Sequence, residues 1–268
     1  MIKTIQRSLF CVLAFSLIVS CKKEDSEKTT DPVIETPVQS TNKILMVVTS
    51  NNQLKDGSPA GYFLPEAIDL YKALKAAGYQ ITFASPAGGK APMYERTTYV
   101  NMNRQYLDTS GLLNGLDSTV TLASIKVTDY KAVCYVGGFA CLFDFPNNPD
   151  VKRITAGIYE SGGIVAAVCH APAALLNVIL SNGKSFIENK KLTGRTIAEE
   201  TNNGQLTKED VLYYFPFLLE DELKIKKAMY SSTGVGKPFV VVDERLVTGQ
   251  NPESTVKVAE AVVSLMRK

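Results

Sequence analysis

The chain has 268 residues, and its 45% hydrophobic content is enough to build one large buried core. Its 29 Lys and Arg residues nearly balance its 27 Asp and Glu residues, and no basic block follows the N-terminus, which argues against nucleic-acid binding. A single histidine and the lack of any Cys-x-x-Cys pair argue against a metal site of the zinc type. No repeat or Gly/Ser/Pro-rich linker divides the body of the chain, so one large domain is favoured.

The N-terminus has the features of an export signal. Two basic residues precede an apolar run, residues 9–19, that is too short for a comfortable transmembrane helix. Residues 18–21 are Ile-Val-Ser-Cys and resemble a bacterial lipobox, which implies cleavage before Cys21 and lipidation of that cysteine. Ordinary secretory cleavage, with Cys21 incidental, is the alternative. We expect residues 1–20 to be a signal peptide and the mature protein to be a membrane-anchored lipoprotein of a bacterial envelope, on its periplasmic or surface face.

A polar segment separates this signal from the rest of the chain. Residues 21–42 are charged, rich in Pro and Thr and free of aromatic residues, so we expect a lipidated cysteine followed by a disordered linker. Removal of the signal leaves 27 basic and 27 acidic residues, so the basic excess belongs to the signal. The folded domain is predicted over residues 43–268.

Three cysteines remain in that domain, namely Cys134, Cys141 and Cys169. A domain of this length does not need disulfides for its stability. Three thiols cannot all pair with one another, so at least one of them stays free.

The first elements of the domain form a βαβ unit. Residues 43–51 are an apolar run ended by turn formers, residues 64–78 carry apolar positions at helical spacing, and residues 79–86 form a second strand. A strand, a helix and a strand at this spacing imply parallel pairing. Residues 87–118 show no clear period, and we expect an insertion there that lies over one end of the sheet as a candidate lid.

Strands and helices continue to alternate along the rest of the chain. The predicted elements are a strand at 131–138, a helix from 149 to 163, a strand at 163–170, a helix at 171–180, a helical stretch at 208–227, a hairpin at 239–249 and a helix at 252–266. This alternation predicts an α/β fold of flavodoxin-like type, with a mostly parallel central sheet and helices on both faces.

The junction between two of these elements has the pattern of a nucleophile elbow. The strand ends at Cys169, and Pro172 stands in the first turn of the following helix, where its missing N–H costs little. Ala167 and Ala171 lie two positions before and after the cysteine, and a sharp strand-to-helix turn requires such small neighbours. The carboxyl edge of a parallel sheet is also where ligands bind in open α/β folds.

Three effects favour a reactive thiol at this position. A helix N-terminus stabilises a thiolate, the backbone N–H of His170 can point at a developing oxyanion, and the imidazole of His170 can move a proton. The alternative is that Cys169 is a buried small hydrophobic residue and His170 a structural one. Cys134 lies in mid-strand and Cys141 follows no comparable turn, so neither is a candidate nucleophile.

Five segments together resemble the ThiJ/PfpI superfamily within the class I glutamine amidotransferase-like fold, and more narrowly its heat-shock-type glyoxalase III branch. They are GYFLPEAIDLYKALKAAGYQITFASPAGG (61–89), YVGGFACLFDFP (135–146), AAVCHAPAALL (166–176), FPFLLEDEL (215–223) and RLVTGQNPES (245–254). The resemblance covers residues 43–268. The amidotransferase triad itself is excluded, because it needs a histidine far downstream of the cysteine and the chain has none.

The resemblance implies a catalytic set of Cys169, His170 and Glu66. Glu66 lies in the first turn of the helix that follows the first strand, so it faces the same sheet edge, and its family role is a hydrogen bond with the thiol. The alternative is an acid that merely favours a helix N-terminus. Glu199 and Glu200 could line the pocket or hold His170, although a solvated acid pair is the default expectation.

The residues expected to form the pocket wall match the family pattern in part and differ from it at one position. Gly137 and Gly138 match the family pattern and are expected to supply backbone N–H groups to an oxyanion. Asp144 also matches. Phe139 stands where relatives carry a histidine, which makes this wall less polar.

The expected function is that of a cysteine-dependent, cofactor-independent enzyme on reactive carbonyls such as methylglyoxal, a lyase that gives a 2-hydroxy acid. The resemblance implies no metal, nucleotide or flavin. Two alternatives use the same cysteine: a peptidase or amidase, and a non-enzymatic stress chaperone or redox sensor. The Tyr/Phe-rich segment at 211–223 is predicted to pack internally or to form the surface of a homodimer.

Overall fold

The computed structural model describes residues 42–94 and 97–268. The predicted signal peptide, Cys21 and nearly all of the predicted linker lie outside the described residues. Within the described ranges, no helix combines the length and the apolar character that crossing a membrane would require.

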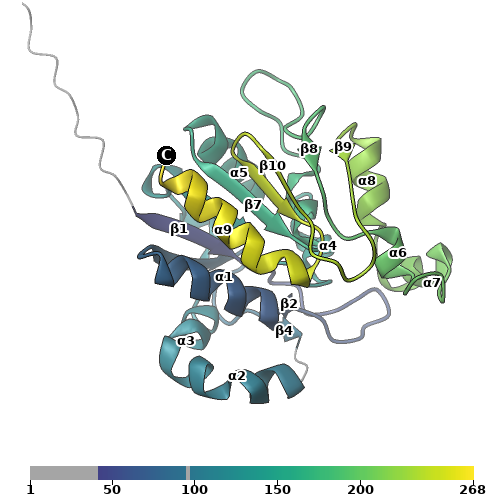
Figure 1. Ribbon diagram of the computed structural model, residues 1–268, viewed down its shortest axis with the longest axis horizontal. Helices are drawn as coiled ribbons and strands as arrows, with labels where there is room; N and C mark the ends of the chain where they lie inside the picture. The colour runs from purple at the N-terminus through teal and green to yellow at the C-terminus, as the bar shows by residue number, and fades with distance from the viewer. Residues whose placement is uncertain (1–41, 95–96) are drawn as a thin grey trace, which may run out of the picture. The chain divides into compact units, whose positions relative to one another are not determined.

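A seven-stranded sheet forms the centre of the domain (Figure 1). Its strands, in spatial order, are β10 (Val240–Asp243), β11 (Leu246–Gly249), β7 (Ile164–Val168), β6 (Ala132–Tyr135), β1 (Lys43–Val47), β3 (Gln80–Ser85) and β5 (Val120–Thr121). All neighbours pair in parallel except β10 and β11, which form the predicted hairpin. Two short pairs lie apart from it, β2 (Tyr62–Phe63) with β4 (Met93–Tyr94), and β8 (Lys191–Leu192) with β9 (Met229–Tyr230). The mostly parallel sheet is confirmed.

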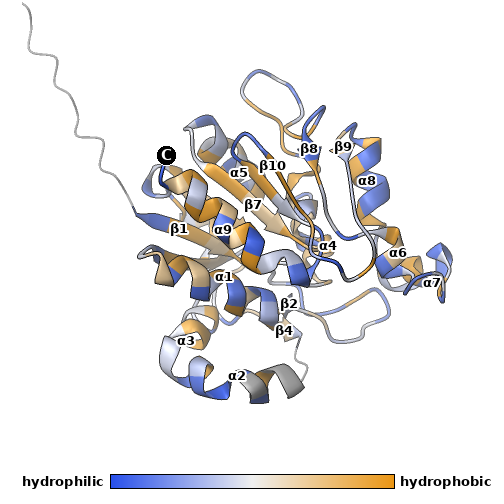
Figure 2. Ribbon diagram, in the orientation of Figure 1, coloured by the Kyte–Doolittle hydropathy of each residue, from blue (hydrophilic) through white to orange (hydrophobic). Residues whose placement is uncertain are grey.

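Helices cover both faces of this sheet. Helices α1 (Leu64–Ala76) and α9 (Thr255–Met266) pack against each other on one face, and α5 (Pro149–Glu160) packs on β6 and β7 from the other. Because successive strand residues point to opposite faces, Leu45 and Val47 join the core beneath α5, while Ile44 and Met46 join the core beneath α1. Strand β7 is accordingly apolar along its whole length, whereas the outer helices alternate apolar and polar residues (Figure 2).

The insertion at residues 87–118 is largely helical, which the sequence did not predict. It contains α2 (Thr97–Ser110) and α3 (Leu112–Leu116), separated by Gly111 with a positive φ of 75°. Leu112 and Leu116 are buried in the core beneath α1, and α3 packs on β3. The segment is thus anchored by buried side chains against the β3 side of the sheet, and it reaches the cavity described below through Tyr94 of β4.

Two further predicted elements differ from the structure. The predicted helix at 171–180 is a five-residue 3₁₀ helix, Ala171–Leu175, because the chain turns away and pairs Ile179 with Ser185 in an antiparallel bridge. The helical stretch at 208–227 is two helices, α7 (Lys208–Tyr214) and α8 (Leu219–Ile225), since Pro216 interrupts it. The remaining helices are α4 (Cys141–Asp144), α6 (Ile197–Glu200) and the 3₁₀ turns Leu122–Ser124, Val127–Asp129 and Pro252–Ser254.

Candidate active site

The cysteine at the end of β7 is held in an unusual backbone conformation. Cys169 has a φ of 61°, in the left-handed region that side chains other than glycine rarely adopt. Its backbone N–H donates to the carbonyl of Gly249 at 2.9 Å, and its carbonyl accepts from the N–H of Arg195 at 2.8 Å. These two hydrogen bonds fix the sharp turn that the sequence predicted.

His170 links the Cys169 thiol to the carboxylate of Glu200. Its Nδ1 lies 3.3 Å from the Cys169 Sγ, and its Nε2 lies 2.6 Å from Oε1 of Glu200, at the end of α6. The side chains of His170 and Glu200 are only 1% and 4% exposed. A carboxylate only accepts hydrogen bonds, so in the neutral imidazole Nε2 carries the hydrogen and the Nδ1 lone pair faces the sulfur. The default expectation of a solvated acid is therefore wrong for Glu200, which holds His170.

Glu66 reaches the same place from the first turn of α1. It is fully buried, and its Oε2 accepts a hydrogen bond from the backbone N–H of Gly137 at 2.8 Å. Its Oε1 has no nitrogen or oxygen partner among the described residues. Burial raises the pKa of Glu66 to about 8, against the opposing effects of the Gly137 N–H and the Cys169 thiol. At neutral pH the carboxyl group therefore holds a proton beside the sulfur.

The resting thiol is protonated as well. Burial raises the pKa of Cys169 well above its usual value, Glu66 adds to the rise once it is ionised, and the positive charge of Arg195 opposes it. The expectation that a helix N-terminus activates the thiol is wrong, because the element that follows is a five-residue 3₁₀ helix and desolvation dominates. The nucleophile therefore needs a base, and Nδ1 of His170 is in place for that role.

The two glycines after β6 have different roles. The N–H of Gly137 is occupied by Glu66, so the prediction that it serves an oxyanion is wrong. A Cβ at this position would lie 2.6 Å from Oε2 of Glu66, so only glycine fits. Gly138 lines the cavity with a φ of 114°, and the N–H groups of Gly138 and His170 donate no hydrogen bond within the described residues. These two N–H groups are the candidate oxyanion donors.

A cavity of about 170 Å³ opens beside the sulfur. Its lining is Phe63, Tyr94, Gly138, Phe139, Cys169, His170, Arg195, Pro252 and Glu253. Phe139 contacts His170 edge to face at a ring-centroid distance of 5.1 Å and stacks on Phe215 at the same distance. Phe139 thus gives the cavity the less polar wall that the sequence predicted, and it also contacts the imidazole of His170.

Asp144 does not line the cavity. Its carboxylate holds the loop that follows β1. Its carboxylate accepts from the Thr49 hydroxyl at 2.8 Å and from the backbone N–H of Ser50 at 2.7 Å. Burial raises its pKa to about 6, although these hydrogen bonds oppose the rise. No group of three or more His, Cys, Asp or Glu side chains in the described part of the chain is arranged to hold a metal ion.

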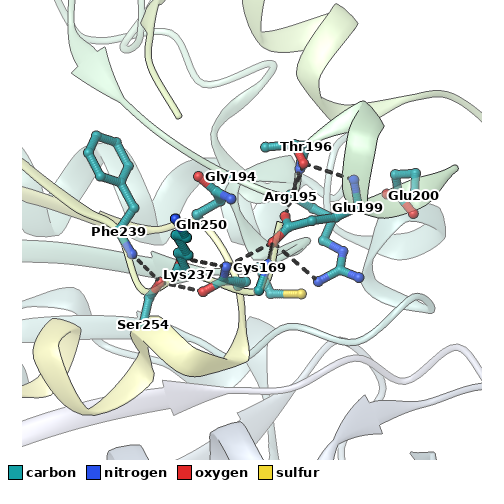
Figure 3. A network of polar contacts seen from close by, with 12 residues as sticks. Cys169, Gly194, Arg195, Thr196, Glu199, Glu200, Lys237, Phe239, Gln250 and Ser254 are labelled. Atoms are coloured by element: carbon teal, nitrogen blue, oxygen red, sulfur yellow. Dashed lines mark hydrogen bonds and ion pairs between the residues drawn. The ribbon is translucent and has the colours of Figure 1, made fainter. Parts of the chain in front are cut away.

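Glu199 organises the loops on the far side of the site (Figure 3). Its Oε2 accepts from the backbone N–H of Thr196 at 3.2 Å in a capping box, and its Oε1 accepts from Nδ2 of Asn251 at 2.8 Å. The backbone N–H of Gly236 also donates to Oε1, at 3.2 Å. One buried carboxylate therefore ties the start of α6 to the loops around 236 and 251.

Sequence reasoning missed Arg195 entirely and misjudged Glu200. The capping-box pattern Thr196-x-x-Glu199 was a usable signal, because it assigns Glu199 to the helix end and leaves Glu200 free for another role. Nothing local to Arg195 marks it as a cavity residue.

The fold and the site define a flavodoxin-like α/β protein with a cysteine-centred pocket. A profile of the DJ-1/PfpI family matches residues 61–265, and the chain belongs to this family. Glyoxalase 3 of Candida albicans is 31% identical over 239 residues, which cover 83% of this chain and 97% of that protein. The glutathione-independent glyoxalase HSP31 of Saccharomyces cerevisiae is 31% identical over 237 residues, covering 84% and 98%.

A solved structure agrees with this placement. The crystal structure of the Rapid Encystment Protein 24 kDa from Francisella tularensis superposes with a TM-score of 0.75 at 30% identity, covering 84% of this chain and 98% of that one. The predicted ThiJ/PfpI membership, the flavodoxin-like fold and the similarity to glyoxalase III proteins are confirmed.

Proposed function

We propose that this protein is a glutathione-independent glyoxalase that converts small 2-oxoaldehydes such as methylglyoxal into 2-hydroxy acids. The observation that carries the proposal is a cluster in which Cys169 and His170 line a small cavity, while Glu200 is paired with His170 and Glu66 is buried beside Cys169. The names of the relatives agree with it. A cavity this small suits a metabolite of few atoms better than a polypeptide.

The first step forms a carbon–sulfur bond. Nδ1 of His170 takes the thiol proton, and the sulfur adds to the aldehyde carbon, giving a hemithioacetal. The oxygen that gains negative charge accepts hydrogen bonds from the N–H groups of Gly138 and His170. Glu200 holds the imidazole in the required tautomer and stabilises the imidazolium that forms.

The second step moves a proton between adjacent carbons. His170, or Glu66 in its ionised form, removes the hydrogen from the carbon that bears sulfur, and a proton returns to the neighbouring carbon, which leaves a thioester of a 2-hydroxy acid. A group with a pKa of about 8 exchanges protons readily near neutral pH, which suits Glu66 to this shuttle. Water then hydrolyses the thioester, releasing the 2-hydroxy acid and restoring the thiol.

The proposal is tested by incubating the purified protein with methylglyoxal or glyoxal and no glutathione. We expect lactate or glycolate to appear in proportion to substrate lost. If neither product forms, the glyoxalase proposal fails. If the protein instead forms an acyl-enzyme with ester or amide substrates that added nucleophiles intercept, it is a cysteine hydrolase.

Glu200→Gln tests the role of the second carboxylate. The amide keeps the shape of the side chain but can donate to Nε2, which favours the tautomer that has no lone pair facing sulfur. We expect kcat for methylglyoxal to fall ~100-fold or more with little change in the melting temperature. Glu199→Gln is the matched control, since Glu199 ties loops together: it should lower stability more than kcat. A Glu200→Gln protein with wild-type kcat would contradict the assignment.

We also propose that the protein is exported and anchored by its N-terminus. The lipobox-like residues 18–21 and the polar segment behind them support a Cys21 that is lipidated on its thiol and its new amine, with residues 22–42 as a spacer and 43–268 as the catalytic domain. Mass spectrometry of the mature N-terminus tests this, and we expect a chain that starts at a lipid-modified Cys21. An unmodified Cys21, or cleavage elsewhere, rejects the anchor.

A further inference from the structure

Arg195, a cation that the mechanism does not use, lines the cavity. It does so beside Cys169, and its side chain is 23% exposed, so a ligand can reach it. No other Lys or Arg side chain lines the cavity among the described residues. In Figure 3 the Arg195 guanidinium and the Cys169 thiol both lie below the Glu199 carboxylate.

This partly buried guanidinium forms one long ion pair, with Glu199, and leaves a buried N–H without an acceptor in the described part of the chain. Its Nε is buried and has no hydrogen-bond partner among the described residues. Its Nη1 lies 3.9 Å from Oε1 of Glu199, beyond hydrogen-bond distance. That oxygen already accepts from Asn251 and Gly236. By contrast, His170 and Glu200 are paired at 2.6 Å.

A buried guanidinium N–H without a hydrogen-bond acceptor is costly, and an anion that binds beside Arg195 offsets this cost. Guanidinium groups pair especially well with carboxylates, through two parallel hydrogen bonds. We propose that Arg195 is a specificity-determining residue and that the preferred substrate is a 2-oxoaldehyde with a carboxylate at its other end. This inference rests on the glyoxalase function proposed above and names the substrate class for it.

The rest of the cavity fits such a molecule. Phe63, Tyr94 and Phe139 offer apolar surface to a short methylene chain between the two polar ends. The reaction leaves the distant carboxylate untouched, because R–CO–CHO plus water gives R–CHOH–COOH whatever group R carries. Glu253 also lines the cavity and would repel an anion, but it is exposed, so solvent and salt weaken its charge.

The test compares 4,5-dioxopentanoate with methylglyoxal as substrates for the full-length protein. For the wild type we expect kcat/KM to be ~10- to 100-fold higher for 4,5-dioxopentanoate, the range that one charge-assisted pair supplies. Arg195→Met should lower this ratio to near one. Arg267→Met removes an exposed arginine near the C-terminus and should leave the ratio unchanged. Glu253→Gln should raise the ratio.

Binding is measured separately from turnover. Calorimetry on Cys169→Ser protein with 2-hydroxypentanedioate, the product expected from 4,5-dioxopentanoate, should show binding that Arg195→Met abolishes. Arg195→Lys, which keeps the charge but not the two parallel donors, should retain part of it. If Arg195→Met fails to fold, the partial loss of binding expected for Arg195→Lys provides the test instead.

The outcomes separate the two proposals. Turnover of methylglyoxal without preference for the carboxylated substrate, or a preference that survives Arg195→Met, overturns the role of Arg195 alone. Failure to turn over either substrate overturns the glyoxalase function, while binding of 2-hydroxypentanedioate that depends on Arg195 would still support an anion site in this cavity.

Discussion

Cys169→Ser is expected to abolish glutathione-independent conversion of methylglyoxal, with kcat falling ~10⁴-fold or more. A serine hydroxyl holds its proton far more tightly than a thiol, and the buried imidazole that suffices for sulfur does not ionise it. The fold should survive, because the two side chains differ little in volume. Product analysis by chromatography and a melting curve on the same sample measure both effects.

Cys141→Ser is the matched control for this variant. Cys141 is also buried, and its thiol donates to the carbonyl of Gly138 at 3.1 Å, a hydrogen bond that a hydroxyl can also make. We expect it to retain most of the activity. Equal product formation by Cys169→Ser and the wild type would remove Cys169 from the mechanism.

Glu66→Gln is expected to change how stability depends on pH. The folded protein holds the Glu66 proton up to a pKa of about 8, whereas an unfolded chain releases it near the ordinary value of 4.5. Folding therefore becomes less favourable as pH rises from 4.5 to 8. Glutamine stays neutral and accepts the same hydrogen bond from Gly137. Relative to the wild type, the variant should gain on the order of 5 kcal/mol in free energy of unfolding across this range.

Urea unfolding at pH 4.5, 6 and 8 measures this difference. At pH 4.5 and below the two proteins should have similar stability, and at pH 8 the variant should be the more stable one. Its activity should nevertheless fall, because the amide cannot move a proton. Glu260→Gln, an exposed change on α9 with the same loss of charge, is the control. A stability difference that stays constant with pH would show that Glu66 is ionised in the folded protein at neutral pH.

Much of the fold could be predicted from local patterns. The buried strands are short apolar runs between turn formers, and α5 begins at Pro149 as expected. The elbow was predictable because Ala167, Cys169 and Pro172 lie within six residues of one another. Glu66 was identified only through the family resemblance, since an acid in the first turn of a helix is common for electrostatic reasons alone.

The parts that could not be predicted depend on tertiary packing. Glu200 meets His170 across 30 residues of chain, and its position is set by the loops that Glu199 ties together. The pKa of Cys169 is raised because the surrounding fold excludes water, an effect that no sequence motif reports. The role of Gly137 was predicted wrongly for the same reason, because its N–H donates to the carboxylate of Glu66, 71 positions away.

Because Cys169 has a positive φ, the side chain that activity requires lowers the stability of the fold. A side chain in this backbone conformation costs ~1–2 kcal/mol that glycine does not. Of two inactive variants that both lack the thiol, Cys169→Gly should therefore be more stable than Cys169→Ala, the reverse of the usual order. Selection for thermal stability alone would favour loss of the nucleophile, so the presence of cysteine at this strained position is itself a sign of selection for chemistry.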